Sequence, residues 1–380
     1  MIVYKLYLHT RGVGMSILSP FKKIHDSLLD SVARYFIRRH EMDNIHKKHH
    51  LYSHITLSDE QKEKIDTLFI QNYGKKFSYD WHRLYQSYEG VFDECYFPEI
   101  LYTTKLEPKL NPANYAKVLG DKNLCNLICE NIEGIRCPKT YLSCIYGTWR
   151  DGANHILKEE EAKSIVFDIG ECVIKKSIDT DSGRDVMMCN ISNGVDIKSN
   201  LPLSKIFAEM GENFIVQERI QQYDALSAIY PDALNTFRVI TYIADGDIHT
   251  APLVLKMGRN GADKDNMHYG GISIGVSDTG ILKKVAYSEY QERFTKHPDT
   301  GVPLEGCVID KVPNILDSAK KIHARIPWLK IISYDLGLDK DGRVVLIEIN
   351  LRSQGTWFPQ MVNGQSLFGE HTAEMLSLIR

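Results

Sequence analysis

Three oxygen-bearing side chains near the C-terminal end could hold a hard cation. Alternating apolar and polar residues predict two strands, 331–338 and 343–349, joined by a turn that contains an Asp-Gly pair. Strand side chains repeat every two residues, so Glu348 and Asn350 share one face and Asp335 can lie beside them. Two carboxylates and one amide oxygen suit Mg²⁺, which takes substrate phosphates as further ligands. A solvated surface hairpin is the alternative, but an unpartnered carboxylate in such apolar runs would be costly to bury.

Three basic residues fall on a second predicted hairpin, whose strands span 237–243 and 248–257. Arg238, Lys256 and Arg259 would place three fixed cations near one another, which is unfavourable unless an anion joins them. A γ-phosphate, or an acyl phosphate made from it, meets that requirement, and arginine can bind its oxygens through two parallel hydrogen bonds. The hairpin therefore predicts a site for a transferred phosphoryl group.

Two lysines further upstream are candidates for nucleotide phosphates. Asp121 can cap a helix, and a helix N-terminus with Lys122 beside it favours a phosphate, although an exposed Asp-Lys pair is also compatible. Lys175 and Lys176 end a predicted strand and precede a loop of small residues in which Gly183 is the single glycine. Such a lysine can reach the α- and β-phosphates while backbone N–H groups cover the rest. An edge strand protected by lysines is the alternative.

The order of these motifs resembles the ATP-grasp superfamily. The C-terminal succession of D-x-G, an acidic turn and E-x-N is similar to its metal-binding end. The segments NTFRV, KMGRNG and HPDTGVPLEG are similar to its sugar-transfer-associated branch, which is connected with surface and capsular polysaccharide biosynthesis. The resemblance implies an α+β fold in which two subdomains with antiparallel sheets sandwich ATP. The chain departs from the family pattern at Lys256, where an arginine is expected.

The resemblance also suggests how the chain is divided. Residues 1–95 form a mainly helical N-terminal region, because apolar residues recur there at three- and four-residue intervals. Residues 96–210 contain a proline-rich linker and the first ATP-grasp subdomain. Residues 211–380 form the second subdomain, with the metal and substrate site.

Further site residues are implied by the resemblance alone. It selects Lys175 rather than Lys176 as the phosphate ligand, and it places the segment of Gln217, Glu218 and Ile220 against adenine, where an extended backbone offers a donor and an acceptor. In the family an acid near the end of this segment holds the ribose hydroxyls. Asp224 and Glu218 are both candidates for that contact.

The reaction implied by the family begins with ATP and Mg²⁺ activating a carboxylate as an acyl phosphate, with release of ADP. An amine then attacks and forms an amide. We expect a carboxylate–amine ligase for a sugar acid or amino acid in surface polysaccharide assembly, with Arg352 beside the acid substrate. A phosphotransferase acting on a hydroxyl and a non-catalytic nucleotide-binding protein are the alternatives. The sequence has no G-x-S-x-G motif and no Walker-type P-loop.

The composition sets the remaining bounds. Among 380 residues, 43% are hydrophobic and 25% charged, and the formal net charge of −3 gives no reason to expect nucleic acid as a partner. Eight cysteines without C-x-x-C spacing are typical of reduced thiols. We find no secretory signal and no apolar run long enough for a membrane span, so we expect a cytoplasmic protein. Basic groups in the helical region could contact a membrane that carries lipid-linked sugars, although an exposed helix face explains them equally well.

Overall fold

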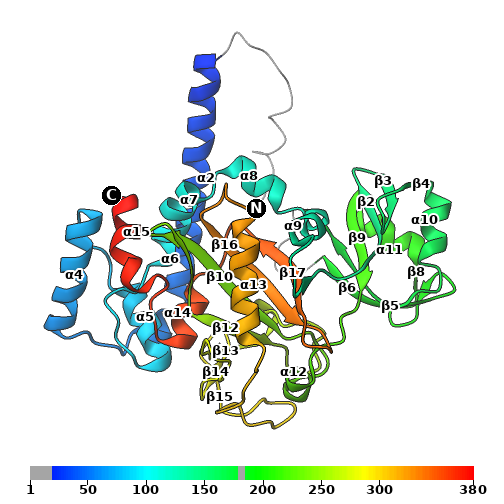
Figure 1. Cartoon of the computed structure of the whole chain (residues 1–380). Coiled ribbons are helices and arrows are strands. Elements are labelled where there is room, and N and C mark those ends of the chain that lie inside the picture. Colours follow the sequence, from blue (N-terminus) through cyan, green and yellow to red (C-terminus); the bar gives the residue numbers. More distant parts are fainter. Residues whose placement is uncertain (1–18, 179–184) are drawn as a thin grey trace.

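The computed structural model describes residues 19–178 and 185–380, and in this part of the chain the strands form two separate sheets (Figure 1). The larger sheet has the order β1-β17-β16-β10-β12-β13-β14-β15, with β11 paired to β10, and the smaller has the order β4-β3-β2-β9-β5-β6-β7-β8. Among these strands every pairing is antiparallel except that of β1 with β17. The expected α+β class with two antiparallel sheets is confirmed.

The larger sheet contains both hairpins that the sequence predicted. Its strands are β1 (Ile135–Arg136), β10 (Thr236–Ala244), β11 (Asp247–Thr250), β12 (Leu253–Met257), β13 (Ile272–Val276), β14 (Ala286–Tyr287), β15 (Arg293–Phe294), β16 (Ile331–Leu338) and β17 (Val344–Asn350). The β16–β17 turn is held locally, because Asp339 accepts from the backbone N–H of Arg343 at 2.9 Å and Gly342 has a φ of 76°. The second predicted strand of the other hairpin is divided into β11 and β12, and both pair with β10.

The smaller sheet packs one face against two helices. Its strands are β2 (Thr140–Ile145), β3 (Thr148–Asp151), β4 (Ile156–Leu157), β5 (Gly170–Lys176), β6 (Val186–Ser192), β7 (Val195–Asp196), β8 (Leu201–Pro202) and β9 (Asn213–Glu218). Helices α10 (Glu159–Ile165) and α11 (Leu203–Met210) pack on Ile174, Phe214 and Val216. Because side chains alternate, Lys175 and Gln217 lie on the opposite face.

Helices cover both faces of the larger sheet. They are α2 (Ser19–Lys47), α3 (His49–Tyr52), α4 (Asp59–Tyr73), α5 (Asp80–Glu89), α6 (Glu99–Leu101), the π-helix η2 (Tyr102–Leu106), α7 (Glu107–Leu110), α8 (Ala113–Leu119), η3 (Lys122–Leu124), α9 (Cys125–Cys129), α12 (Asp224–Ile229), η4 (Met267–Tyr269), α13 (Val312–Ala324), α14 (Trp357–Asn363), η5 (Gly369–His371) and α15 (Thr372–Leu378). Within the described segments, no helix has both the length and the apolar character that crossing a membrane requires.

The helical N-terminal region shares its core with the larger sheet. Buried residues of α4 and α5, such as Phe69 and Tyr85, belong to one apolar cluster with Ile240 of β10, Met361 of α14 and Leu376 of α15. Figure 1 shows α4, α5, α14 and α15 together on one side of the molecule, with the smaller sheet at the other end. The predicted division at residue 95 therefore crosses a continuous core.

The predicted boundary at residue 210 separates β9 from its own sheet. β9 pairs with β2 on one side and with β5 on the other, so it is a central strand of the smaller sheet. Conversely, β1 precedes that sheet in the chain but pairs with β17 of the larger one. Alternation predicts a strand, whereas its partner depends on long-range packing.

Candidate functional site

The three predicted metal ligands lie on one face of the β16–β17 hairpin. Asp335 is directly opposite Glu348, and Ser333 is directly opposite Asn350. Opposed residues of an antiparallel pair project to the same side, and so do residues two apart on one strand. The register shifts between Asp335 and Leu336, so the regular pairing changes beside the two acids.

Asp335 is held by two cations from neighbouring strands. Arg238 of β10 donates from Nε to Oδ1 at 2.8 Å and from Nη2 to Oδ2 at 3.3 Å, and Lys256 of β12 lies 3.0 Å from Oδ1. Burial by itself raises the pKa of Asp335, but the charges of Arg238 and Lys256 outweigh it and bring the pKa to about 2. The carboxylate is therefore ionised. Arg238 and Lys256 were expected to bind the anion of a ligand, and in this structure they bind the carboxylate of Asp335.

The structure does not bring Arg259 to this cluster. Its Nη2 lies 2.6 Å from Oε2 of Glu292, its Nε donates to the carbonyl of Gly270, and its guanidinium lies over the ring of Phe294. Among the described residues, none of these contacts is with Arg238, Lys256 or Asp335. Arg259 follows the end of β12 at Met257, so strand geometry does not determine its direction. Its role at a transferred phosphoryl group stays a prediction.

Sequence reasoning missed a second buried acid at this cluster. Asp265 accepts from the backbone N–H of Thr236 at 3.1 Å and lies 3.8 Å from Nζ of Lys256. Burial raises its pKa, and Lys256 opposes that shift. Asp265 precedes β13 in an irregular segment, where the sequence offers no periodicity to locate it.

The two predicted phosphate lysines meet the metal hairpin from the side of the smaller sheet. Lys122 lies 2.9 Å from Oε1 of Glu348, and Lys175 donates to the carbonyl of Ile347 at 3.4 Å. Both lysines are 6% exposed. Burial, reinforced by the charge of Lys122, lowers the pKa of Lys175 to about 8. Gly183 lies outside the described residues.

The adenine-side candidates are in different environments. Gln217 is buried and donates from Nε2 to Oγ1 of Thr140 at 3.3 Å, while its Oε1 has no partner among the described residues. Ile220 is half-buried, and Asp224 is exposed at the first position of α12. The two candidates for the ribose contact therefore differ, because Asp224 is open to solvent whereas the Glu218 carboxylate is already bound by protein groups.

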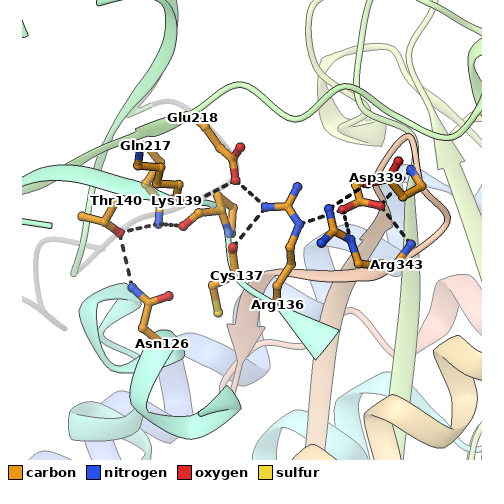
Figure 2. A network of polar contacts seen from close by, with 11 residues as sticks. Asn126, Arg136, Cys137, Lys139, Thr140, Gln217, Glu218, Asp339 and Arg343 are labelled. Carbon is orange, nitrogen blue, oxygen red and sulfur yellow. Dashed lines mark hydrogen bonds and ion pairs between the residues drawn. The ribbon is translucent and has the colours of Figure 1, made fainter. Parts of the chain in front are cut away.

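Glu218 belongs to a charged network that joins the two sheets (Figure 2). It pairs with Nη1 of Arg136 and accepts from the backbone N–H of Lys139 at 2.6 Å. Arg136 also donates from Nε to Asp339 at 2.8 Å, and Arg343 donates to the same carboxylate at 3.0 Å. No local pattern indicates a role for Arg136, because its partners Glu218 and Asp339 are 82 and 203 residues away in the chain.

Arg352 points towards the short helix α7. Its Nη1 lies 3.8 Å from Oε2 of Glu107, and its Nε is buried without a partner among the described residues. The loop that carries it still adjoins the Asp335 cluster, because Arg238 donates from Nη1 to the carbonyl of Gln354 at 2.9 Å. Arg352 therefore lies between the predicted metal site and the helices.

The three predicted ligands can hold magnesium only together with oxygen atoms from a bound ligand and water. Within residues 19–178 and 185–380, no group of three or more His, Cys, Asp and Glu side chains is arranged to hold a metal. Asp335, Glu348 and the amide of Asn350 are hard oxygen donors, which Mg²⁺ accepts together with water and phosphate oxygens. An ion at this hairpin would thus require the phosphates to complete its coordination.

One family of known proteins matches most of the chain. A family model described as sugar-transfer associated ATP-grasp matches residues 101–374. No curated protein matches the chain.

Among solved structures, the VanG D-Ala:D-Ser ligase from Enterococcus faecalis has a TM-score of 0.41 and 14% identity over 68% of this chain and 60% of its own. Biotin carboxylase from Campylobacter jejuni has a TM-score of 0.41 and 14% identity over 71% of this chain and 48% of its own. D-alanyl-alanine synthetase A from Vibrio cholerae has a TM-score of 0.40 and 13% identity over 69% of this chain and 66% of its own. The chain therefore spans about half to two thirds of the length of these proteins.

Proposed function

The chain belongs to the sugar-transfer-associated ATP-grasp family and has its fold, and on that premise we propose that it is an ATP- and Mg²⁺-dependent carboxylate–amine ligase. It would form an amide through an acyl phosphate, acting in the cytoplasm on a sugar acid or an amino acid used in surface polysaccharide biosynthesis. One observation carries the proposal: Lys122 and Lys175 meet the hairpin of Asp335 and Glu348 at the junction of the two sheets.

The charges at this junction favour a bound polyphosphate. Lys122 and Lys175 bring two buried positive charges to the end of β17, where Lys122 lies 2.9 Å from Oε1 of Glu348, and phosphate oxygens suit such a pair of cations. We assign both lysines to the α- and β-phosphates, and the role of Gly183 in the phosphate loop stays a prediction. The base would lie against the backbone from Gln217 to Ile220, with Asp224 or Glu218 at the ribose.

The cations of the larger sheet suit the phosphoryl group that is transferred. Arg238 and Lys256 now neutralise Asp335, and a bound γ-phosphate would share their hydrogen bonds as charge develops on its oxygens. Asp335, Glu348 and Asn350 would hold Mg²⁺, which supplies neutralisation of the phosphate charge. Arg352 would orient the acid, and Arg259 would steady the loop around Gly270 through its contact with that carbonyl.

The proposal is tested by measuring ADP release from ATP and Mg²⁺ with a panel of sugar acids and amino acids, with and without amines. A ligase yields ADP and an amide only when both substrates are present. ADP formed with a hydroxyl compound alone would identify a phosphotransferase. Tight ATP binding with no ADP under any condition would identify a nucleotide-binding protein without catalysis, and the ligase proposal would be abandoned.

A further inference from the structure

Buried acids of the short helices α6 and α7 lie next to the loop that follows β17. We propose that they form the subsite for the amine substrate, in which Glu107 of α7 and Gln354 of the loop accept hydrogen bonds from its ammonium group. This inference rests on the proposed ligase function and gives these short helices a part in it.

The loop of residues 351–356 connects the cluster around Asp335 with the buried acids of α6 and α7. On one side, the carbonyl of Gln354 accepts from Arg238, which also binds Asp335. On the other, Thr356 donates from its backbone N–H to Oε1 of Glu99 at 3.3 Å, and its hydroxyl donates to Oε2. The same loop thus contacts the phosphoryl-transfer cluster and the buried acids.

Three buried oxygen atoms behind this loop have no partner among the described residues. They are Oε1 of Glu107, Oε1 of Gln354 and the hydroxyl of Tyr102. Glu107 is 4% exposed, and the other two residues are fully buried. Leaving such an atom unpaired costs about 1–3 kcal/mol, so native structures rarely do so without a reason. Tyr102 begins the π-helix η2, a distortion that occurs frequently at functional sites.

The charge of this region favours a cation. Glu107 and Glu99 are buried, Glu41 of α2 lies close enough to affect both, and Arg352 is the nearby cation, 3.8 Å from Glu107. Burial raises the pKa of Glu107 to about 7, and Arg352 only partly opposes it. A bound ammonium group would favour the ionised form of Glu107 and would bring several N–H donors to the unpaired oxygens.

Two buried donors belong to the last residue of β17 and to the loop that follows it. Nδ2 of Asn350 and Nε of Arg352 are buried without partners among the described residues. A ligand acid group suits these donors, and an ammonium group suits Glu107 and Gln354. In the proposed step the ammonium group first passes a proton to the ionised carboxylate of Glu107, and its nitrogen then attacks the acyl carbon. The bond from that carbon to the phosphate oxygen breaks, and the released phosphate takes the second proton. Arg352 is part-exposed, with 26% of its side chain accessible.

The test separates acyl-phosphate formation from use of the amine. Hydroxylamine, a small uncharged nucleophile, traps an acyl phosphate as a hydroxamate, while ammonium chloride, ethanolamine and glucosamine serve as cationic amine probes. We expect Glu107→Gln to keep hydroxamate formation and to raise the KM for the cationic amine at least tenfold. The matched control Glu63→Gln, on the exposed side of α4, should change neither quantity.

A second variant tests the same subsite in case Glu107→Gln does not fold. Tyr102→Phe removes a hydroxyl that has no described partner, so the fold should be retained while the KM for the amine rises severalfold. If the wild type forms no hydroxamate with any acid, the ligase function itself fails. If it does, and both variants leave the KM for the amine unchanged, the amine subsite is refuted while the ligase function stands.

Discussion

Arg136 donates from Nε to Oδ2 of Asp339 across 2.8 Å, which links the first crossover between the two sheets to the turn of the metal hairpin. The end of β9, from which the chain returns to the larger sheet, joins the same network. The carboxylate of Glu218 pairs with Arg136, and the backbone N–H of Glu218 donates to the carbonyl of Lys139 at 2.9 Å. The end of β9, where adenine is proposed to bind, is thereby fixed relative to the hairpin proposed to bind the metal (Figure 2).

Arg136→Gln should destabilise the protein, because it leaves the nearly inaccessible Asp339 with only the exposed Arg343 as a charged partner. Removing one partner of a buried pair costs about 3–5 kcal/mol, and the partial exposure of Arg136 reduces this to about 2 kcal/mol. Urea denaturation measures the change. Arg343→Gln, at a side chain that is 57% exposed, is the control and should cost under about 1 kcal/mol. Equal effects of the two substitutions would contradict a special role for Arg136.

Asp335→Asn and Glu348→Gln should both abolish ADP formation but should differ in stability. Asp335→Asn leaves Arg238 and Lys256 facing a neutral amide in a buried place, which should cost about 3 kcal/mol. Glu348 is 31% exposed, so its substitution should cost about 1 kcal/mol. Thermal melts and the ADP assay test this together. Normal turnover by either variant would rule out the metal assignment.

Nucleotide affinity should fall as the pH rises through about 8. The pKa of Lys175 is lowered to about 8, chiefly by burial and further by Lys122, so its ammonium loses the proton above that pH. Between pH 7 and pH 9 the affinity for ATP, measured by calorimetry, should decrease by up to about tenfold. Lys175→Arg keeps the charge and should flatten this dependence, whereas Lys176→Arg, paired with Asp185, should not. A steep dependence that persists in Lys175→Arg would assign the titration to another group.

Glu107 should make the protein less stable as the pH rises from about 5 to 7. Burial raises its pKa in the folded state from 4.5 to about 7, so its contribution to stability is present below pH 4.5 and is lost as the pH approaches 7. Over this range Glu107→Gln should gain up to about 3 kcal/mol relative to the wild type. Urea unfolding at several pH values measures the difference, with Glu63→Gln as the reference. A constant difference across the range would show that Glu107 is ionised at every pH tested.

The limits of the proposed subdomains can be examined with a protease. The apolar core shared by the helical region and the larger sheet should protect the chain around residue 95. Cleavage should instead occur first at exposed loops, so early cutting near residue 95 with release of a stable fragment would restore the predicted division.

Local patterns in the chain were sufficient for individual elements and for ligands that share a strand. Period-two alternation placed Glu348 and Asn350 on one face of β17. Asp335 lies opposite Glu348 because the register shifts between Asp335 and Leu336, and the turn alone does not predict that shift. The capping box that Ser58 and Gln61 form at the start of α4 is also a local feature. These features depend on hydrogen bonds and side-chain positions within a few residues of one another.

Tertiary structure decided which charges meet. Asp335 neutralises Arg238 and Lys256, Arg259 turns to Glu292, Glu218 is bound by Arg136, and Arg352 faces Glu107. These partners are separated by tens to hundreds of residues, and their pairing depends on how the sheets and helices pack. A buried charge pairs with the opposite charge that the fold places next to it. Residue types alone therefore identified these groups as candidates but did not predict which of them form ion pairs.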